Sequence, residues 1–361
     1  MKWSHFRAFR PVCPVCRPAS PSAPFALQVA AVAEEDELGI QQGVLQCSNP
    51  HCWREYPILD GIPLLIPQLR EYITENVFHL VLRNDLSEAN ESILGDCCGP
   101  GTWFDLTRQH LSSYTWDHYA EFDPQERHQT PAPGSLGRLL SCCWPWLEPL
   151  PPGPLLDVGC SVGGLTWKLA ERTTELVLGI DLNFAMLRLA QSILRTGQVR
   201  YSRRRVGVVY DRHEFPVPTP GAERVDFWAC NVEALPFASD TFSAAVAMNV
   251  LDSVRSPVDL LRSINVALQP GGKLLLSCPF DWSAAVTPIE SWLGGHSQRN
   301  PQGGASAPML EALLTPGSHP WSLPDMRITH RSEEFPWTVR MQERSVIQYQ
   351  PLVLAAEKLT P

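Results

Sequence analysis

A short apolar run that ends in a glycine-rich loop is the first segment with a chemical signature. Residues 155–164 read LLDVGCSVGG, so Asp157, Gly159 and Gly163 have the spacing D-x-G-x-x-x-G. Glycines let the backbone approach a ligand closely, and the N-terminus of a following helix offers unpaired N–H groups. Dinucleotide-binding loops have the spacing G-x-G-x-x-G instead. The segment therefore predicts a ligand-binding loop of a different type.

Polar side chains also follow the later apolar runs. Asp181 ends the second predicted strand, eighteen residues after the second loop glycine, where a carboxylate can accept hydrogen bonds from two ribose hydroxyls. Asp252 and Asp281 follow the fourth and fifth predicted strands, and Asn249 lies just before Asp252. Parallel strands bring their carboxyl ends to one edge of a sheet, where ligands bind. We therefore expect these residues around one cleft; a helix cap or loop carboxylate is the alternative for each aspartate.

The order of these segments resembles the S-adenosylmethionine-dependent methyltransferases of the Rossmann-like class. Their first motif has the same loop spacing, with Ser161 here in place of the usual middle glycine. Residues 230–237, CNVEALPF, resemble the family's D-A-E-x-L-P-F stretch, whose acidic residue holds the adenine amino group. Asn231 stands where Asp is usual, and its side-chain oxygen can accept the same hydrogen bond. The resemblance implies S-adenosylmethionine as cofactor, bound by Asp157, Gly159, Gly163, Asp181, Asn231, Val232 and Asn249.

A closer resemblance covers residues 155–295. It is to the methyltransferase domain of ovothiol-forming enzymes, the mercaptohistidine N-methyltransferases. Residues 159–163 (GCSVG), 249–252 (NVLD), 277–282 (SCPFDW) and 292–295 (WLGG) resemble that domain's G-C-A-V-G, N-L-I-D, S-S-P-Y-T-W and W-L-G-G. The sequence departs from the family at Asp281, where the family has Thr, and it lacks the sulfoxide-synthase half. The resemblance implies N-methylation of an imidazole or a similar amine.

Methyl transfer is an in-line displacement on a sulfonium, so the enzyme chiefly holds the nucleophile close and aligned. A carboxylate can orient an imidazole or amine nucleophile or take its proton. Asp252, Asp281 and Asn249 are therefore the predicted catalytic residues. Three aromatic residues are either pocket walls or ordinary core: Trp282, Trp292 and Tyr119.

Four cysteines in two close pairs form a second candidate site. Cys13-x-x-Cys16 and Cys47-x4-Cys52 are separated by thirty residues, and four thiolates so arranged suit tetrahedral zinc. The second pair is looser than C-x-x-C, so His51 could compete as a ligand. Residues 56–65, YPILDGIPLL, resemble the segment after the second knuckle in the zinc ribbons that accompany tRNA and rRNA methyltransferases. We predict a structural zinc ion; a ribbon that folds without metal is the alternative.

The charge of the chain argues against a surface built to hold phosphates. The net charge is −9, and residues 1–70 contain six basic and six acidic side chains. One tight basic cluster stands out, and we interpret it as a solvated loop or hairpin: Arg200, Arg203, Arg204 and Arg205. No stretch approaches the roughly 20 apolar residues of a membrane helix. No apolar run follows the first basic residues either, which predicts a cytoplasmic protein without a signal peptide.

The alternation of apolar runs from residue 155 onward predicts the elements that position these residues. Strands are expected at 155–158, 176–180, 225–229, 242–248 and 273–278, with helices at 165–172, 184–194 and 258–268. Further strands are expected at 337–341 and 346–354. The prediction is an α/β fold with a Rossmann-like seven-stranded methyltransferase sheet and a small N-terminal zinc ribbon. Its domains would be 1–70 (ribbon), 71–150 (helical linker or cap ending in several prolines) and 151–361 (methyltransferase).

Three functional hypotheses follow. The first is a small-molecule N-methyltransferase, supported by residues 277–295 and the acidic charge. The second is an rRNA or tRNA base methyltransferase that uses the ribbon to dock RNA or a partner. The third is a regulator that has kept the fold and lost the cofactor, which the intact residues 157–163 and Asp181 oppose.

Overall fold

The computed structural model describes residues 1–19, 23–83, 85–126, 131–296, 298–299 and 303–360. Its strands are β1 (Leu27–Asp36), β2 (Gly39–Cys47), β3 (Glu55–Leu59), β4 (Ile62–Leu65), β5 (Leu155–Val158), β6 (Val177–Asp181), β7 (Gln198–Val206), β8 (Val209–Pro216), β9 (Val225–Cys230), β10 (Phe242–Met248), β11 (Leu268–Cys278), β12 (Met326–Ser332), β13 (Trp337–Gln342), β14 (Ser345–Tyr349) and β15 (Leu352–Lys358). Its α-helices are α1 (Trp3–Phe9), α2 (Leu69–Val81), α3 (Glu88–Cys98), α4 (Trp103–Tyr119), α5 (Ser135–Cys143), α6 (Gly164–Ala170), α7 (Phe184–Thr196), α8 (Pro257–Ala267) and α9 (Ser306–Leu313).

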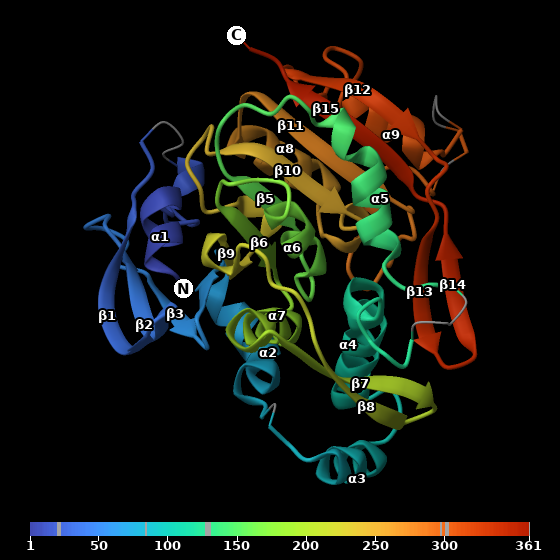
Figure 1. The fold of residues 1–361 in the computed structure, drawn as a ribbon. Helices are drawn as coiled ribbons and strands as arrows, with labels where there is room; N and C mark the ends of the chain where they lie inside the picture. Colours follow the sequence, from blue (N-terminus) through green and yellow to red (C-terminus); the bar gives the residue numbers. More distant parts are fainter. Residues whose placement is uncertain (20–22, 84, 127–130, 297, 300–302, 361) are drawn as a thin grey trace.

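Across the described residues, eleven strands form one sheet in the order β1-β2-β3-β4-β9-β6-β5-β10-β11-β15-β12. The seven strands from β9 to β12 form the methyltransferase part of this sheet, and its five inner strands are those predicted from residues 155–278. The inner strands β9, β6, β5, β10 and β11 run parallel, while β15 is antiparallel to both neighbours. Figure 1 shows helices on both sides of this sheet, with the N-terminal strands at one end and β12 near the other. The predicted α/β class is confirmed.

The strands are apolar on both faces because each face is covered. Leu155 and Val177 belong to the core under α2, α5, α6 and α7, whereas Leu156 and Leu178 belong to the core under α1, α8 and α9. Alternate residues of a strand point to opposite faces, so buried parallel strands read as continuous apolar runs. This pattern made the strands recognisable in the sequence.

Capping residues determine where the helices that follow the strands begin and end. The Asn183 side chain accepts a hydrogen bond from Met186 N at 3.2 Å and starts α7, and Gly197 in the left-handed conformation ends it. Ser256 caps α8, with Pro257 at its first position. These signals explain why the predicted and observed bounds of α7 and α8 agree closely.

The N-terminal strands continue the large sheet. β4 pairs in parallel with β9, with Leu64 opposite Ala229 and Leu65 opposite Cys230. On one face of this junction, the Phe9 ring of α1 stacks on Phe242 at a centroid distance of 5.4 Å. Residues 1–70 therefore share both hydrogen bonds and core with the strands that follow residue 225.

Three expectations about the strands need correction. β11 begins at Leu268 and so includes residues 268–272, whereas the strand was expected to begin at residue 273. Residues 337–349 form the separate hairpin β13–β14, since the chain leaves it at Gln350 before starting β15. β12, which closes the sheet, had no predicted counterpart. Among the described residues, no helix combines the length and apolar character that crossing a membrane requires.

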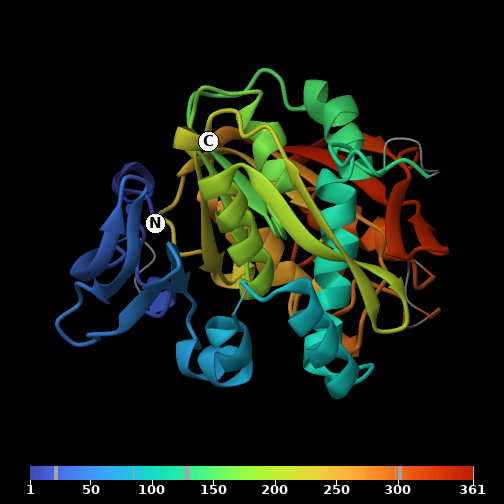
Figure 2. The same ribbon diagram turned by 60° about the horizontal axis from the view of Figure 1, so that its bottom comes forward.

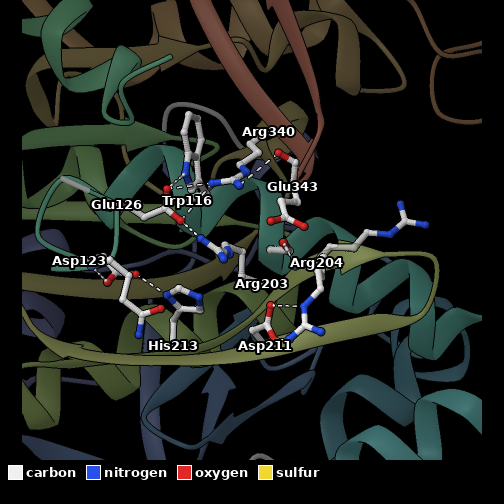
Figure 3. Close-up of polar contacts among 12 residues, drawn as sticks. Trp116, Asp123, Glu126, Arg203, Arg204, Asp211, His213, Arg340 and Glu343 are labelled. Atoms are coloured by element: carbon white, nitrogen blue, oxygen red, sulfur yellow. Dashed lines mark hydrogen bonds and ion pairs between the residues drawn. The ribbon is translucent and has the colours of Figure 1, made fainter. Parts of the chain in front are cut away.

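The arginine cluster lies on the hairpin β7–β8, and most of its guanidinium groups are paired with carboxylates of the same chain. Figure 3 shows Arg203 of β7 and Arg340 of β13 meeting the Glu126 carboxylate just after α4. The Glu126 side chain is 0% exposed, and its contact to Arg340 Nη1 is 2.8 Å. Trp116 of α4 also donates its Nε1 proton to Glu126. The carboxylate of Glu126 thus joins two hairpins to α4.

Replacing Glu126 tests this buried junction. Glu126→Gln leaves two buried guanidinium groups beside a neutral amide, and removing one partner of a buried ion pair costs about 3–5 kcal/mol. We expect the free energy of unfolding to fall by that order in denaturant titrations. Glu333→Gln, which touches an exposed ion pair with Arg331, should change it by less than about 1 kcal/mol. Equal effects of the two variants would show that the junction carries no special stability.

Candidate functional site

Strained backbone gathers at the carboxyl ends of three neighbouring strands. Ser161 (φ 53°), Asn249 (φ 54°) and Phe280 (φ 56°) follow β5, β10 and β11 in the left-handed region. Non-glycine residues adopt this conformation at a cost, and such strain collects at ligand sites. The predicted cleft therefore lies where three strands end in constrained turns.

Asn249 carries an unused donor at this edge. Its Oδ1 accepts a hydrogen bond from Ser277 Oγ at 2.8 Å. Its Nδ2 is buried and has no hydrogen-bond partner in the described part of the chain. Buried polar atoms are normally satisfied, so this one is a candidate ligand contact.

The loop after β5 requires its glycines for two physical reasons. Gly159 (φ 73°) and Gly163 (φ 85°) have backbone conformations that side chains disfavour. A Cβ at Gly159 would also lie 2.7 Å from Val250 Cγ2, and one at Gly163 would lie 2.7 Å from the Phe227 ring. The loop is thus held against the sheet, with the N-terminus of α6 directly behind it.

Two residues of helix α4 form hydrogen bonds with the backbone of this loop. The Tyr119 hydroxyl donates to Val162 O at 2.7 Å, and Gly164 N donates to His118 Nδ1 at 2.9 Å. Burial lowers the pKa of His118 to about 4, so its imidazole is neutral and Nδ1 can accept. Tyr119 is buried and serves as a loop anchor, so between the two readings for this residue the structure favours core packing.

The two predicted cofactor carboxylates lie beside the loop in different surroundings. Asp157 is buried and accepts the Thr166 hydroxyl at 2.6 Å; burial raises its pKa to about 7, opposed by that hydrogen bond. Asp181 accepts N–H groups from Ser161 and Asn183, each at 2.8 Å. Burial raises the pKa of Asp181, while these N–H bonds oppose the rise. Asp181 therefore also organises the loop.

Asn231 has a local role in addition to the predicted one. Its Oδ1 accepts Glu233 N at 2.9 Å and caps the short 3-10 helix Val232–Ala234 that follows β9. Val232 is buried at the start of that helix. A carboxamide oxygen has a second lone pair, so the predicted adenine contact stays compatible with this cap.

The structure brings the two predicted acceptor-side aspartates together. Asp281 N donates to Asp252 Oδ2 at 2.8 Å. Burial raises the pKa of Asp252, while N–H bonds, first that of Asp281, oppose the rise. The Asp281 side chain is exposed, and its Oδ2 accepts the Tyr349 hydroxyl at 2.8 Å.

Two tyrosines at this site were missed by the sequence analysis. Burial raises the pKa of Tyr114 to about 12, and the Asp181 and Asp252 carboxylates add to the rise. Burial also raises the pKa of Tyr349 to about 12, together with its hydrogen bond to Asp281. Tyr114 lies in an aromatic stretch of α4, and this composition could have indicated a pocket residue. Tyr349 lies on the hairpin β13–β14, and no local sequence motif indicates that it reaches the site.

Trp282 and Trp292 stack on each other with ring centroids 5.9 Å apart. Trp282 Nε1 donates to Ser306 Oγ at 3.2 Å, and Trp292 Nε1 donates to Thr287 O at 2.8 Å. Thr287 in turn donates to the backbone of Asp252 and Val254. The tryptophan pair therefore buttresses the loop that carries the aspartates.

The four N-terminal cysteines converge. All four Sγ atoms lie within 4.8 Å of one another, and the Cys13–Cys52 and Cys16–Cys47 Sγ distances are both 3.9 Å. A zinc tetrahedron with bonds of about 2.3 Å requires separations of about 3.8 Å. The Tyr56 hydroxyl lies 3.2 Å from Cys13 Sγ, and Asn49 Nδ2 donates to Cys16 Sγ at 3.4 Å. These residues fit zinc, whereas the exposed His51 is outside the group.

Residues 156–276 match the family model described as a methyltransferase domain. A tRNA U34 carboxymethyltransferase of Pseudoalteromonas translucida is 31% identical over 132 residues, which cover 37% of this chain and 34% of that protein. A ubiquinone/menaquinone biosynthesis C-methyltransferase of Klebsiella pneumoniae is 30% identical over 124 residues, covering 34% and 41%. The chain thus spans only about a third to two fifths of the length of these relatives.

A solved S-adenosylmethionine-dependent methyltransferase of Methanosarcina mazei aligns with 22% identity and a TM-score of 0.38, covering 58% of this chain and 93% of that one. The family match spans β5 to β11, which hold the predicted cofactor loop and the strand before Asp252. Residues 156–276 are therefore a methyltransferase domain.

Proposed function

We propose that the protein transfers a methyl group from S-adenosylmethionine to a ring or amine nitrogen of a small molecule. The observation that supports the acceptor class is the linked pair Asp252 and Asp281, which stands at the edge of the sheet beside Tyr114 and Tyr349. Carboxylate and phenol groups suit an acceptor that presents N–H groups or positive charge. They do not suit a phosphate-rich acceptor.

The residues around the loop fit the cofactor. Gly159 and Gly163 keep the loop close to the sheet. We propose that Asp181 binds the ribose hydroxyls and that Asn231 and Val232 contact the adenine. The free Nδ2 of Asn249 is a donor for the amino-acid part or for the acceptor. When bound, S-adenosylmethionine supplies a methyl group on a sulfonium, and the electron pair of the broken C–S bond stays on sulfur.

The chain itself has a positioning task in this scheme. Asp281 or Asp252 accepts an N–H of the acceptor and aims its lone pair along the line of transfer. The methylated nitrogen then carries one proton too many, which passes to a carboxylate or to water. The raised pKa of Asp252 suits it to hold that proton.

The mercaptohistidine resemblance supports an imidazole as the acceptor ring. Asp281 stands where that family has Thr, so we propose that it carries a difference in acceptor. A cytoplasmic location stays a prediction, as do the domain bounds 1–70, 71–150 and 151–361.

RNA methylation is the second candidate, because several relatives of about 30% identity bear the name tRNA U34 carboxymethyltransferase. The basic hairpin offers little support. Arg203 is paired with Glu126, and Arg205 with Asp211. Phosphate contacts need free cations, so small molecules remain the favoured acceptors.

We also propose structural zinc at Cys13, Cys16, Cys47 and Cys52. All four positions of a tetrahedron are then occupied by protein, which leaves no open site for catalysis. The metal would stiffen the module whose β4 continues the sheet, and the balanced charge of residues 1–70 suits a structural or docking role.

Replacing Asp181 tests the cofactor site. Asp181→Ala removes the proposed ribose contact and should weaken S-adenosylmethionine binding by about 1.5–3 kcal/mol, measured by calorimetry. Asp181→Asn keeps one acceptor oxygen for the loop and should lose less. Exposed Glu223→Ala is the control and should bind normally. Unchanged affinity in Asp181→Ala would refute the assignment.

The acceptor class is tested by label transfer. Protein with methyl-labelled cofactor is incubated with a panel of small imidazoles and amines, and separately with tRNA and rRNA. We expect label in the small molecules. Asp252→Asn and Asp281→Asn should lower single-turnover transfer by roughly 10²-fold with cofactor affinity nearly intact, because misplacement of about 1 Å costs that much. Exposed Asp259→Asn is the control. Label in RNA alone, or full activity in both variants, would contradict the proposal.

Zinc is tested by elemental analysis of freshly isolated protein. We expect one ion per chain, lost when Cys13 and Cys16 are both replaced by Ser. The matched control replaces the exposed neighbours Cys97 and Cys98 and should keep the metal. Chelation should increase hydrogen exchange first in residues 1–70, because bound metal contributes directly to folding of so small a module. Metal-free protein with an unchanged exchange pattern would refute the zinc site.

A further inference from the structure

A cavity of about 280 Å³ lies apart from the residues assigned to methyl transfer. It is lined by residues 82, 83, 85 and 86 between α2 and α3, by Glu91 of α3, by α4 and α7, and by the hairpin β7–β8. Figure 2 shows α3 and α4 beside this hairpin, on the side of the sheet away from the N-terminal strands. Small-molecule sites start at about 300 Å³, so the cavity suits a small ligand.

The wall combines two chemistries. One part is apolar and is formed by Leu82, Leu86, Phe104, Leu111 and Leu189. The other part is basic and is formed by Arg83, Arg108, Arg188, Arg200 and Arg212. Asp85 and Glu91 are the carboxylates on the described wall. Apolar surface beside an excess of guanidinium groups is the pattern expected for a ligand with an apolar body and an anionic end.

The arginines of the wall differ in their partners, because Arg83 pairs with Asp85 and Arg188 pairs with Asp60. The single carboxylate of Glu91 is shared by Arg108, at 3.1 Å from its Nε, and Arg212. Arg200 and Arg212 also direct Nη2 groups at the carbonyl oxygen of Leu86, at 3.0 and 3.5 Å, and Arg200 Nε lies 3.9 Å from the Glu214 carboxylate. A carbonyl oxygen satisfies a hydrogen bond but carries no counter-charge. One positive charge of the Arg108–Arg212 pair is therefore left uncompensated by Glu91.

Two side chains of the same wall also hold polar atoms without partners. Arg108 is 6% exposed and Tyr201 is 5% exposed. Arg108 Nη1 and the Tyr201 hydroxyl have no hydrogen-bond partner in the part of the chain that the structure describes. Buried polar groups are normally satisfied, so these two atoms are candidate contacts for a ligand or a water.

We propose that this cavity binds a small amphiphilic anion, meaning an apolar chain or ring that ends in a phosphate or carboxylate. The apolar part lies against the leucines and Phe104, and the anionic end lies among Arg108, Arg200 and Arg212. This site is additional to the cofactor and acceptor sites and does not depend on the proposed methyl transfer.

The cavity and the methyl-transfer site lie along the same helix, α4. Leu111 of α4 lines the cavity, and Tyr114, three residues further along the same helix, lies near Asp181 and Asp252. Residues three apart lie on one face of a helix. A ligand in the cavity would therefore sit about one helical turn from the acceptor side, separated from it by α4 side chains.

Calorimetric titrations of the full chain with four probes distinguish the contribution of the ligand's apolar part from that of its anionic end. The probes are octyl phosphate, octanoate, octanol and inorganic phosphate. We expect one-to-one binding of octyl phosphate or octanoate, at least about tenfold tighter than octanol or inorganic phosphate, because neither fragment fills both parts of the wall. The better of the two anions identifies the headgroup. Absence of saturable binding of both anions would overturn the proposal.

Variants locate the bound probe. Arg212→Gln should weaken binding of the preferred anion by about tenfold or more, the loss expected for a charged hydrogen-bonded partner. Arg200→Gln, at a half-exposed position that is safe for folding, should act in the same direction. Arg327→Gln on β12 lies outside the cavity and is the matched control. Binding unchanged in both cavity variants would refute the site.

Competition with S-adenosylhomocysteine distinguishes this site from the cofactor site. The anion should bind with similar affinity whether or not S-adenosylhomocysteine is present. Displacement of one by the other would place the anion in the cofactor site and refute the proposal. A protein that binds the anion but not S-adenosylhomocysteine would instead refute the proposed function and leave this site standing.

Discussion

The burial of the last two turns of α4 against the cofactor loop is the constraint on which the rest of the structure depends. His118 and Tyr119 hold the backbone of residues 162–164, and each such hydrogen bond contributes about 1 kcal/mol. Asp117 accepts Trp337 Nε1 at 3.1 Å and Ser135 N at 2.7 Å, which fixes the β13–β14 hairpin and the start of α5. Tyr114, on the same helix, has its pKa raised by burial and by the nearby carboxylates of Asp181 and Asp252. One helix therefore sets the loop and the acceptor side together.

The hairpins extend this arrangement outward. Trp337 stacks on Tyr349 at 4.9 Å, so the contact with Asp117 also places the tyrosine that binds Asp281. Glu126 ties the hairpins β7–β8 and β13–β14 to the end of α4. At the opposite end of the sheet, β4 adds the cysteine module to β9. The site is thus assembled from segments that are distant in sequence but joined through buried polar contacts.

The sequence predicted those parts of the site that depend on local spacing. The loop glycines, Asp181 and the carboxylates after the fourth and fifth strands all lie within a few residues of a buried strand, so the order of elements determined their place. The parallel strands were recognisable because both faces are covered. Tyr349, the strand β12 and the continuation of the sheet by β4 depend on long-range pairing, which no local pattern encodes. The ion pair of Arg203 could not be predicted for the same reason, because its partner Glu126 is 77 residues away in the sequence.

A methyl group held in the loop of residues 159–164 should face Asp252 and Asp281. The most direct test is a crystal structure with an S-adenosylmethionine analogue that has a C–NH₂ group in place of the S-methyl group. We expect the analogue's amine, which marks the position of the methyl group, to lie within about 4–6 Å of the Asp252 or Asp281 carboxylate. An analogue bound away from the loop, or one whose amine faces the side opposite both carboxylates, would contradict it.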